Sequence, residues 1–410
     1  MAEPAPGISF DAIFSPEQLA DPYPAYRTLR ETTPVFHVPD TTMWLVSRYA
    51  DVTAVLRDKR LGHHSMPNAT PNLTEEQRRE MMDNPALAGL SRTMLLQNPP
   101  DHTRLRSLVV KAFDARRIEQ MRDRVRSIAN ELVDALLASN SGDLVRGFNH
   151  PLPVIVICDL LGVPEADRAG FIEETNVQGR LIDPTPMTEE ELHQANVNMV
   201  ESAEYFNALC DDRRKHPQDD LLTALVESET EHGKLTRDEL TSNISLLFAA
   251  GHETTVNLLG NALLALYRNR DQLDLLRARP ELFATGADEF IRYDSSVQLS
   301  ARSTFEPIEL GGCEIPTGHE VLTLLGAANR DPEQFDDPDR LDLTRQNVKP
   351  ASFGGGIHYC LGAQLARLET EEALRILLER LPDLELDNID TPEWKPTITL
   401  RGVKTLPAHW

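Results

Sequence analysis

Apolar residues recur at steps of three and four through most of the chain between residues 101 and 292. This spacing places them on one face of a helix. Proline and glycine interrupt the pattern at residues 151–153, 162–164 and 216–217. The sequence therefore predicts a succession of helices over this part of the chain.

Strand-like segments lie on both sides of the helical part. A polar turn separates residues 34–38 from 43–46, which predicts two strands, and a helix is predicted over Tyr49–Leu56. The portions expected to contain β-structure are 32–60, 295–325 and 397–406. The pattern predicts a mainly α fold with a minor β part.

A long polar excursion covers residues 62–98 and contains several prolines, with a helix expected near Glu75–Met82. It could cover a pocket. The 410 residues are 40% hydrophobic, which is ample for a substantial core. Because no Gly/Ser-rich linker or low-complexity tract divides them, we expect a single large domain.

The N-terminus lacks the basic and apolar regions of a signal peptide, and no apolar run approaches the length of a membrane span. Four cysteines lie singly and far apart, which agrees with a reducing compartment. We therefore expect a soluble, cytoplasmic protein that is monomeric and has no membrane partner.

The formal net charge is −24, which argues against binding to nucleic acid or to an anionic membrane surface. The segment 101–126 has the opposite sign, because its arginines and lysine outnumber its acids. On residues alone, this segment is most simply interpreted as a solvated helix face.

The candidate chemistry begins with Cys360, which follows three consecutive glycines, Gly354–Gly356, and precedes a helical pattern. Glycines allow a sharp turn and close approach to a ligand or to another segment. A cysteine near a helix N-terminus has a lowered pKa. Such a thiolate serves as nucleophile, with His358 as a partner, as redox thiol or as metal ligand. Because no Cys-x-x-Cys is present, structural zinc is disfavoured.

A second candidate lies in a long buried helix that begins with the capping-box pattern Thr236–Glu239. Its middle contains residues 250–255, Ala-Gly-His-Glu-Thr-Thr, where the glycine costs about 1 kcal/mol of helix propensity. The simplest interpretation is a tolerated kink in which Thr254 bonds to a carbonyl one turn earlier.

The stretch Phe353–Gly362 resembles the haem-binding loop of the cytochrome P-450 family, Phe-Gly-x-Gly-x-His-x-Cys-x-Gly, at every fixed position. The resemblance implies a cytochrome P-450 fold, a haem b cofactor and Cys360 as the axial ligand of the iron. It further implies haem contacts in this loop and in the long helix. These residues are Phe353, Gly354, Gly362, Ala250 and Gly251.

Residues 250–255 resemble the family's oxygen-activation motif, and Glu253 and Thr254 match its acid and alcohol. In the family this pair delivers protons to bound oxygen. Four further residues match positions that bind the haem propionates, namely His102, Arg106, Arg302 and His358. The sequence Glu289-Phe-Ile-Arg292 resembles the family's structural ion pair, with Arg340 expected to add a second arginine.

The resemblance implies a monooxygenase that inserts one oxygen atom from O2 into a small, largely apolar organic substrate by hydroxylation or epoxidation. Electrons would come from a separate ferredoxin and its NAD(P)H-dependent reductase. Residues expected to dock this partner are Arg104, Lys111, Arg116 and Arg117. Those expected to line the substrate pocket are Leu246, Leu247, Ala250, Val297, Leu299 and Ile398. The alternatives are a peroxide-driven peroxygenase, a haem-dependent isomerase and a non-catalytic haem sensor.

Overall fold

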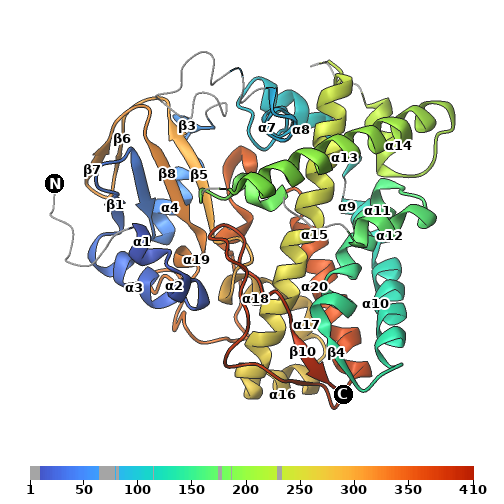
Figure 1. The fold of residues 1–410 in the computed structure, drawn as a ribbon. Helices are drawn as coiled ribbons and strands as arrows, with labels where there is room; N and C mark the ends of the chain where they lie inside the picture. Colours follow the sequence, from blue (N-terminus) through green and yellow to red (C-terminus); the bar gives the residue numbers. More distant parts are fainter. Residues whose placement is uncertain are drawn as a thin grey trace. The chain divides into compact units, whose positions relative to one another are not determined.

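The computed structural model describes residues 10–63, 79, 83–113, 115–173, 178–185, 187–228 and 233–410. The helix expected near Glu75–Met82 lies, apart from residue 79, outside these residues. Two compact units are present, and their elements are labelled in Figure 1. The first comprises Met1–Gly62, Ala129–Asn149 and Thr254–Trp410, and the second comprises His63–Ile128 and His150–Glu253.

A five-stranded sheet organises the first unit. Its strands, in spatial order, are β1 (Val35–His37), β2 (Met43–Val46), β8 (Glu320–Leu324), β5 (Leu299–Thr304) and β3 (Leu61–Gly62). The β2–β8 pair is parallel and the other pairs are antiparallel. Segments far apart in sequence are thereby joined, because Leu45 pairs with Leu322 in the β2–β8 register.

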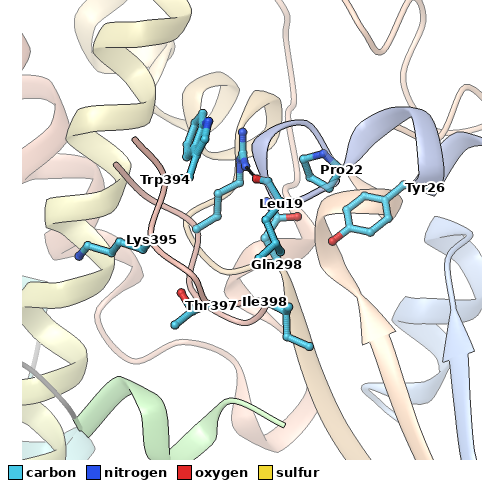
Figure 2. A pocket seen from close by; sticks show the side chains of 9 residues that line it. Leu19, Pro22, Tyr26, Gln298, Trp394, Lys395, Thr397 and Ile398 are labelled. Atoms are coloured by element: carbon cyan, nitrogen blue, oxygen red, sulfur yellow. Dashed lines mark hydrogen bonds between the residues drawn. The ribbon is translucent and has the colours of Figure 1, made fainter. Parts of the chain in front are cut away.

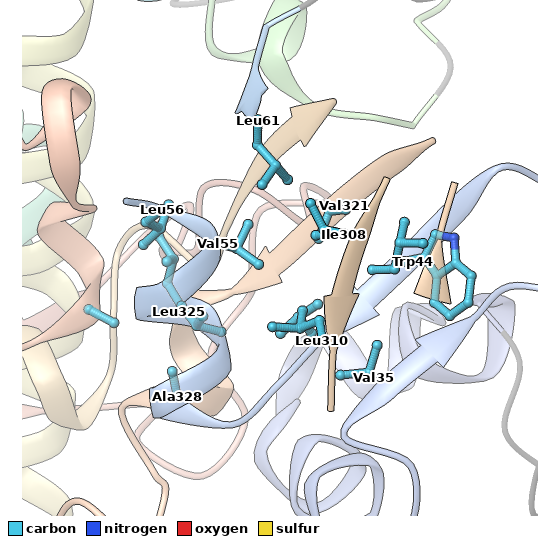
Figure 3. Packing of buried hydrophobic residues seen from close by; sticks show 14 residues of the cluster. Val35, Trp44, Val55, Leu56, Leu61, Ile308, Leu310, Val321, Leu325 and Ala328 are labelled. Carbon is cyan, nitrogen blue, oxygen red and sulfur yellow. The ribbon is translucent and has the colours of Figure 1, made fainter. Parts of the chain in front are cut away.

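An apolar cluster packs against each face of this sheet. Successive side chains of a strand point to opposite faces, so each strand contributes to both clusters. Figure 3 shows one face, where Trp44 and Val321 pack with Val55 of α4 (Tyr49–Val55). On the other face, Leu45 and Leu322 pack in a cluster with residues of α3 (Tyr23–Thr32). The sheet is therefore a buried platform rather than a surface layer.

The remaining elements of the first unit are mostly helical and have the following bounds: α1 Phe10–Ile13, α2 Pro16–Ala20, α16 Arg270–Ala278, α17 Leu282–Thr285, α18 Ala287–Tyr293, α19 Leu325–Ala328, α20 Ala363–Arg380 and the short turns η1 Val145–Asn149, η4 Ala351–Phe353 and η5 Gly356–His358. Small strands complete it: β4 Ser141–Asp143, β6 Ile308–Leu310, β7 Cys313–Ile315, β9 Glu385–Leu386 and β10 Pro407–His409.

The described part of the second unit is helical, with these bounds: α7 Pro85–Ser91, α8 Asp101–Ala112, α9 Ala115–Gln120, α11 Pro151–Leu161, η2 Glu165–Asp167, α12 Arg168–Glu173, η3 Gln178–Ile182, α13 Glu189–Lys215 and α14 Leu221–Glu227. Two helices, α10 (Arg122–Leu136) and α15 (Arg237–Arg268), have residues in both units. Among the described residues, no helix is both long and apolar enough to cross a membrane.

The predicted helices and strands are largely confirmed. The capping box of α15 is present, since the Glu239 backbone N–H donates to Thr236 Oγ1 at 3.2 Å and the Thr236 N–H donates to Glu239 Oε2 at 2.9 Å. The portion 397–406, expected to contain β-structure, holds two isolated antiparallel bridges, Leu400 with Val297 and Val403 with Trp394, rather than a continuous strand. Residues 397–401 instead form a loop bonded to residues 296–298, through Gln298 N–H to Thr399 O and Arg401 N–H to Ser296 O, and β10 begins at Pro407.

A buried ion pair joins three helices of the second unit. Arg213 on α13 and Asp220, which caps α14, have side chains only 3% and 6% exposed, and Nε lies 2.5 Å from Oδ2. The same guanidinium donates to the carbonyl of Gly162 at the end of α11, and Asp220 accepts from the backbone of Thr223. Both charges are thus hydrogen-bonded, as burial requires.

Replacing Asp220 with alanine should lower the free energy of unfolding by about 3–5 kcal/mol, because the guanidinium of Arg213 stays buried without its carboxylate. Denaturant-induced unfolding followed by circular dichroism measures the change. The neighbouring Asp219, whose side chain is fully exposed, provides the control, and Asp219→Ala should leave the midpoint unchanged. Equal losses in both variants would contradict the assignment.

Candidate functional site

The loop before Cys360 is built from two short turns, η4 and η5, and closed by a hydrogen bond from the Cys360 N–H to the carbonyl of Phe353 at 2.8 Å. Gly354 and Gly356 have φ values of 69° and 62°, in the region that favours glycine. Helix α20 begins at Ala363, with Gly362 at its N-cap. The predicted position of Cys360, just before a helix N-terminus, is confirmed.

Glycine is required in this loop by a neighbouring helix. A Cβ at Gly356 would lie 2.5 Å from the carbonyl oxygen of Leu56 at the end of α4, and one at Gly355 would lie 3.1 Å from Leu56 Cβ. The close approach expected of these glycines is therefore made to the chain itself. Gly362 differs, because a Cβ there would meet no atom of the chain within 4 Å.

The four cysteines differ in exposure. Burial raises the pKa of Cys158 to about 12 and that of Cys210 to about 11, so both thiols stay protonated at neutral pH. Cys313 is half-buried, whereas Cys360 is exposed. Of the four, Cys360 is the thiol that the fold presents to a ligand.

Arg302 on β5 is a buried cation with no acid beside it in the described part of the chain. Its side chain donates to Ser300 Oγ at 3.0 Å and to the carbonyl of Ala301 at 2.6 Å. Burial lowers the pKa of Arg302 to about 10. Because a buried charge normally needs a counter-charge, this site suits an anionic group of a ligand.

Successive side chains of β5 point to opposite faces of the sheet, which separates the neighbours of Arg302 into two groups. Arg302 pairs with Val321 and lies on that residue's face of the sheet, whereas Leu299 packs on the opposite face with α3. Ile398 belongs to the same cluster as Leu299. Leu299 and Ile398, which are expected to line the substrate pocket, lie in this apolar cluster, and Ser300 shares the face of Arg302. Strand periodicity counted from Arg302 could have shown this.

Helix α15 has one open stripe in its otherwise buried middle. Ala250 is exposed and Leu246, Glu253 and Thr254 are half-buried, whereas Leu247 is buried. Successive exposed and half-buried positions, 246, 250 and then 253 or 254, are three or four residues apart and share one face of the helix. The stripe contains the acid and the alcohol predicted from the sequence.

Gly251 and His252 face the surrounding helices. A Cβ at Gly251 would lie 3.0 Å from Cδ1 of Ile157, so this glycine allows α11 to pack closely. His252 is buried and its Nδ1–H donates to the carbonyl of Phe248 at 2.8 Å. Its ring also lies edge-on to His150, at 6.1 Å between centroids. The polar interruption of α15 is therefore accommodated by specific packing.

The family can now be stated from comparison with known proteins. The model of the family described as Cytochrome P450 matches residues 35–278 and 287–401. The chain belongs to the cytochrome P450 family. The predicted fold and family are confirmed, and with them the haem-iron class of protein.

Relatives of the cytochrome P450 family match nearly the whole chain. PikC, a cytochrome P450 monooxygenase of Streptomyces venezuelae, is 43% identical over 95% of this chain and 91% of its own length. The vitamin D(3) 25-hydroxylase of Pseudonocardia autotrophica is 39% identical over 100% of this chain and 98% of its own. The crystal structure of P450BioI with an acyl carrier protein carrying hexadec-9Z-enoic acid superposes with a TM-score of 0.87 and 36% identity, covering 97% of this chain and 100% of that one. The chain is accordingly an oxygenase.

Haem has two carboxylates and an iron that accepts one thiolate. In the first unit, the exposed Cys360 thiol and the buried Arg302 guanidinium offer these groups their partners, and His358 is half-buried in the cysteine loop. In the second unit, His102 is buried and Arg106 is half-buried, one turn apart on α8. The donor set of each unit fits the cofactor of the family.

The basic residues of α8 and α9 do not all face solvent. Arg104 makes a bidentate ion pair with Glu239. Its Nη2 donates to Oε1, and its Nη1 donates to Oε2 at 3.0 Å. Its role is therefore to tie α8 to the start of α15. Arg117 lies 3.5 Å from Asp219, Arg116 is exposed, and the side chain of Lys111 is outside the described part.

A buried ion network supports the cysteine loop. Arg292 donates from Nε to Glu289 Oε2 at 2.7 Å, and both side chains are at most 1% exposed. The expectation that Arg340 supplies a second guanidinium is wrong. Arg340 is exposed and contributes its backbone carbonyl, whereas Arg345 Nε lies 3.3 Å from Glu289 Oε2. Sequence spacing could not distinguish these arginines, because both follow the same polar turn.

The ion network reaches the cysteine loop through Asn329. Arg292 donates to the carbonyl of Asn329 at 2.9 Å. The Asn329 side chain accepts from the Ala351 N–H at 2.6 Å and donates to Ser352 Oγ at 2.7 Å. Since Ala351–Phe353 is the first turn of the loop, the buried pair fixes where that loop begins.

A small pocket lies beside the loop of residues 394–401, as Figure 2 shows. Arg401 is bonded there to Asp294 at 2.8 Å and to the carbonyl of Leu19 at 2.5 Å, and its guanidinium lies 3.5 Å from the centroid of the Trp394 ring. These groups, with the carbonyl of Ala20, occupy the donors of Arg401. Arg401 therefore holds the loop of residues 394–401 against α2.

Arg345→Ala should reduce the stability of the haem-loaded protein by about 3 kcal/mol, because Glu289 then loses one of its two cationic partners in a buried site. Thermal unfolding and haem release in denaturant measure this loss. Arg340→Ala removes the same charge nearby and should have little effect, because only its backbone is used. A larger loss of stability in Arg340→Ala than in Arg345→Ala would show that Arg340 is the second cationic partner of Glu289.

Proposed function

We propose that the chain is a haem-thiolate monooxygenase in which Cys360 Sγ binds the iron. The observation that carries the proposal is the exposure of this thiol at the end of a fixed glycine loop, two residues before the N-cap of α20. The reaction inserts one oxygen atom from O2 into a C–H or C=C bond of an organic substrate and reduces the other to water with two electrons and two protons. Haem b supplies the oxygen activation, and the thiolate donates electron density to its iron.

The side chains proposed to hold haem are those that match the haem-binding positions of the family. Arg302 and His358 in the first unit, with His102 and Arg106 in the second, bind the propionates through charged hydrogen bonds. Phe353, Gly354 and Gly362 contact haem from the cysteine side, and Ala250 and Gly251 contact it from α15. Two observations support this set: the buried charge of Arg302 and the open space beside Gly362.

Glu253 and Thr254 would hold and relay protons beside the haem in this proposal. Thr254 Oγ1 orients a water, and the Glu253 carboxylate exchanges protons with solvent. Both side chains are half-buried on the open stripe of α15. A peroxygenase, an isomerase or a haem sensor has no need for this pair, so it favours O2 with external electrons.

The electron donor is a separate ferredoxin, reduced by an NAD(P)H-dependent reductase. Acidic ferredoxins are attracted to basic faces by charge complementarity. Arg116, which is exposed, is the centre of the proposed docking site, with Arg117 next to it in sequence and Lys111 five residues earlier. We leave out Arg104, because Glu239 neutralises it.

The substrate is small and largely apolar. The residues proposed to contact the substrate are Leu246, Leu247, Ala250, Val297 and Ser300. Ser300 is included in place of the predicted Leu299 and Ile398, because it lies on the same face of β5 as Arg302. A vitamin D hydroxylase and a fatty-acyl complex of P450BioI are among the relatives, which agrees with extended hydrocarbon substrates.

Thr254→Ala should uncouple turnover. NAD(P)H oxidation continues, but the fraction of electrons recovered in product falls at least about tenfold, because proton delivery is no longer directed to bound oxygen. Product, NAD(P)H and hydrogen peroxide are measured together. Thr254→Ser should restore coupling, and Thr255→Ala at the adjacent buried position is the control. If wild type formed product equally well from peroxide alone, the peroxygenase alternative would replace this proposal.

Arg116→Glu should slow reduction by ferredoxin about tenfold at low ionic strength, and the difference from wild type should shrink as salt increases. Stopped-flow reduction under carbon monoxide measures the rate. Arg340→Glu makes the same charge change at an exposed position of the other unit and controls for net charge. Equal slowing in both variants would argue against a local docking site at Arg116.

A further inference from the structure

Arg367, on the second turn of α20, connects three segments around the cysteine loop. Its Nε donates to Asp288 Oδ1 of α18 at 2.7 Å. Its guanidinium carbon lies 4.5 Å from the centroid of the Phe353 ring, and the group also hydrogen-bonds to the Tyr359 side chain. One cation thus contacts a residue at each end of the loop.

These contacts lie directly beside Cys360. Phe353 is buried and its carbonyl accepts the Cys360 N–H at 2.8 Å, while Tyr359 is bonded to Cys360 along the chain. A planar guanidinium can stack on an aromatic ring and bond to a carboxylate at the same time. Lysine carries the same charge but lacks this fork.

We propose that the positive charge of Arg367, opposed by the negative charge of Asp288, acts on the Cys360 thiolate and so sets the reduction potential of the haem. The proposal rests on the proposed role of Cys360 as axial ligand. A positive charge near the thiolate stabilises the reduced, more electron-rich state of the haem, and a negative charge destabilises it. Groups around a metal ligand tune a centre in this way.

The charge effect and a purely mechanical clamp predict different signs. Arg367→Gln removes a positive charge and Asp288→Asn removes a negative one, so the electrostatic role shifts the potential in opposite directions. Both variants break the same ion pair, however. If the ion pair only held the loop in place, both would shift the potential in the same direction.

The chain offers a matched control on the same helix. Arg375, two turns after Arg367, pairs with Glu371 at 3.2 Å and lies 5.1 Å from the centroid of the Phe283 ring. Arg375→Gln therefore removes an equal charge and similar contacts, but away from the cysteine loop.

The experiment is a dye-equilibrated redox titration of the haem-loaded, substrate-free protein. At the wild-type midpoint, the reduced-to-oxidised ratio should fall about threefold in Arg367→Gln and rise about threefold in Asp288→Asn. Arg367→Lys should stay near wild type, and Arg375→Gln should be unchanged. Shifts of the same sign in Arg367→Gln and Asp288→Asn, or an equal shift in Arg375→Gln, would overturn the proposal.

The Soret band of the carbon monoxide complex separates this proposal from the one on which it rests. Thiolate ligation gives the strongly red-shifted band of the family. Wild type and all four variants should show it. If wild type lacked the band, the role of Cys360 would fail and this proposal with it. A normal band in every variant with unshifted potentials would overturn only the role of Arg367.

Discussion

The structure around the cysteine depends on one buried ion pair, Glu289 with Arg292. Removing both charges from water is costly, and their attraction offsets this only when the remaining donors are satisfied. Arg292 meets this condition by donating to the carbonyls of Asn329, Pro338 and Arg340. Because the side chain of Asn329 then binds the first turn of the cysteine loop, satisfying one buried cation also fixes the start of the functional loop.

Arg302 represents the opposite case, a buried cation whose counter-charge is not supplied by the described chain. Desolvation without a carboxylate destabilises the folded chain, and an anionic ligand that binds only the folded state reverses this by mass action. If Arg302 binds a haem propionate as proposed, cofactor binding and folding stability are linked through this residue. The same strand shows why position alone is not enough, since Leu299 is three residues away yet packs on the opposite face of the sheet.

Local sequence patterns predicted correctly the features that depend on residues close together in the sequence. The capping box of α15, the glycine loop and the position of Cys360 before α20 each involve residues a few positions apart. Contacts between distant segments were not accessible in this way. Arg104 and Glu239 are separated by 135 residues, and the nearby Asp101, which also pairs with Arg104 at 3.2 Å, gives no sign of this second, distant partner. Arg345 was missed for a similar reason, because its approach to Glu289 depends on the path of the whole segment that contains Arg340.

These distant pairings also change the electrostatic picture of the protein. A chain with a net charge of −24 would repel the acidic electron donor proposed above, so its docking would depend on a local surplus of positive charge. Glu239 removes Arg104 from that surplus and Asp219 lies beside Arg117. Among the side chains described on α9, Arg116 is exposed, and salt screens the charge of an exposed side chain strongly. Association with the donor should accordingly depend on individual arginines rather than on the overall charge of these helices.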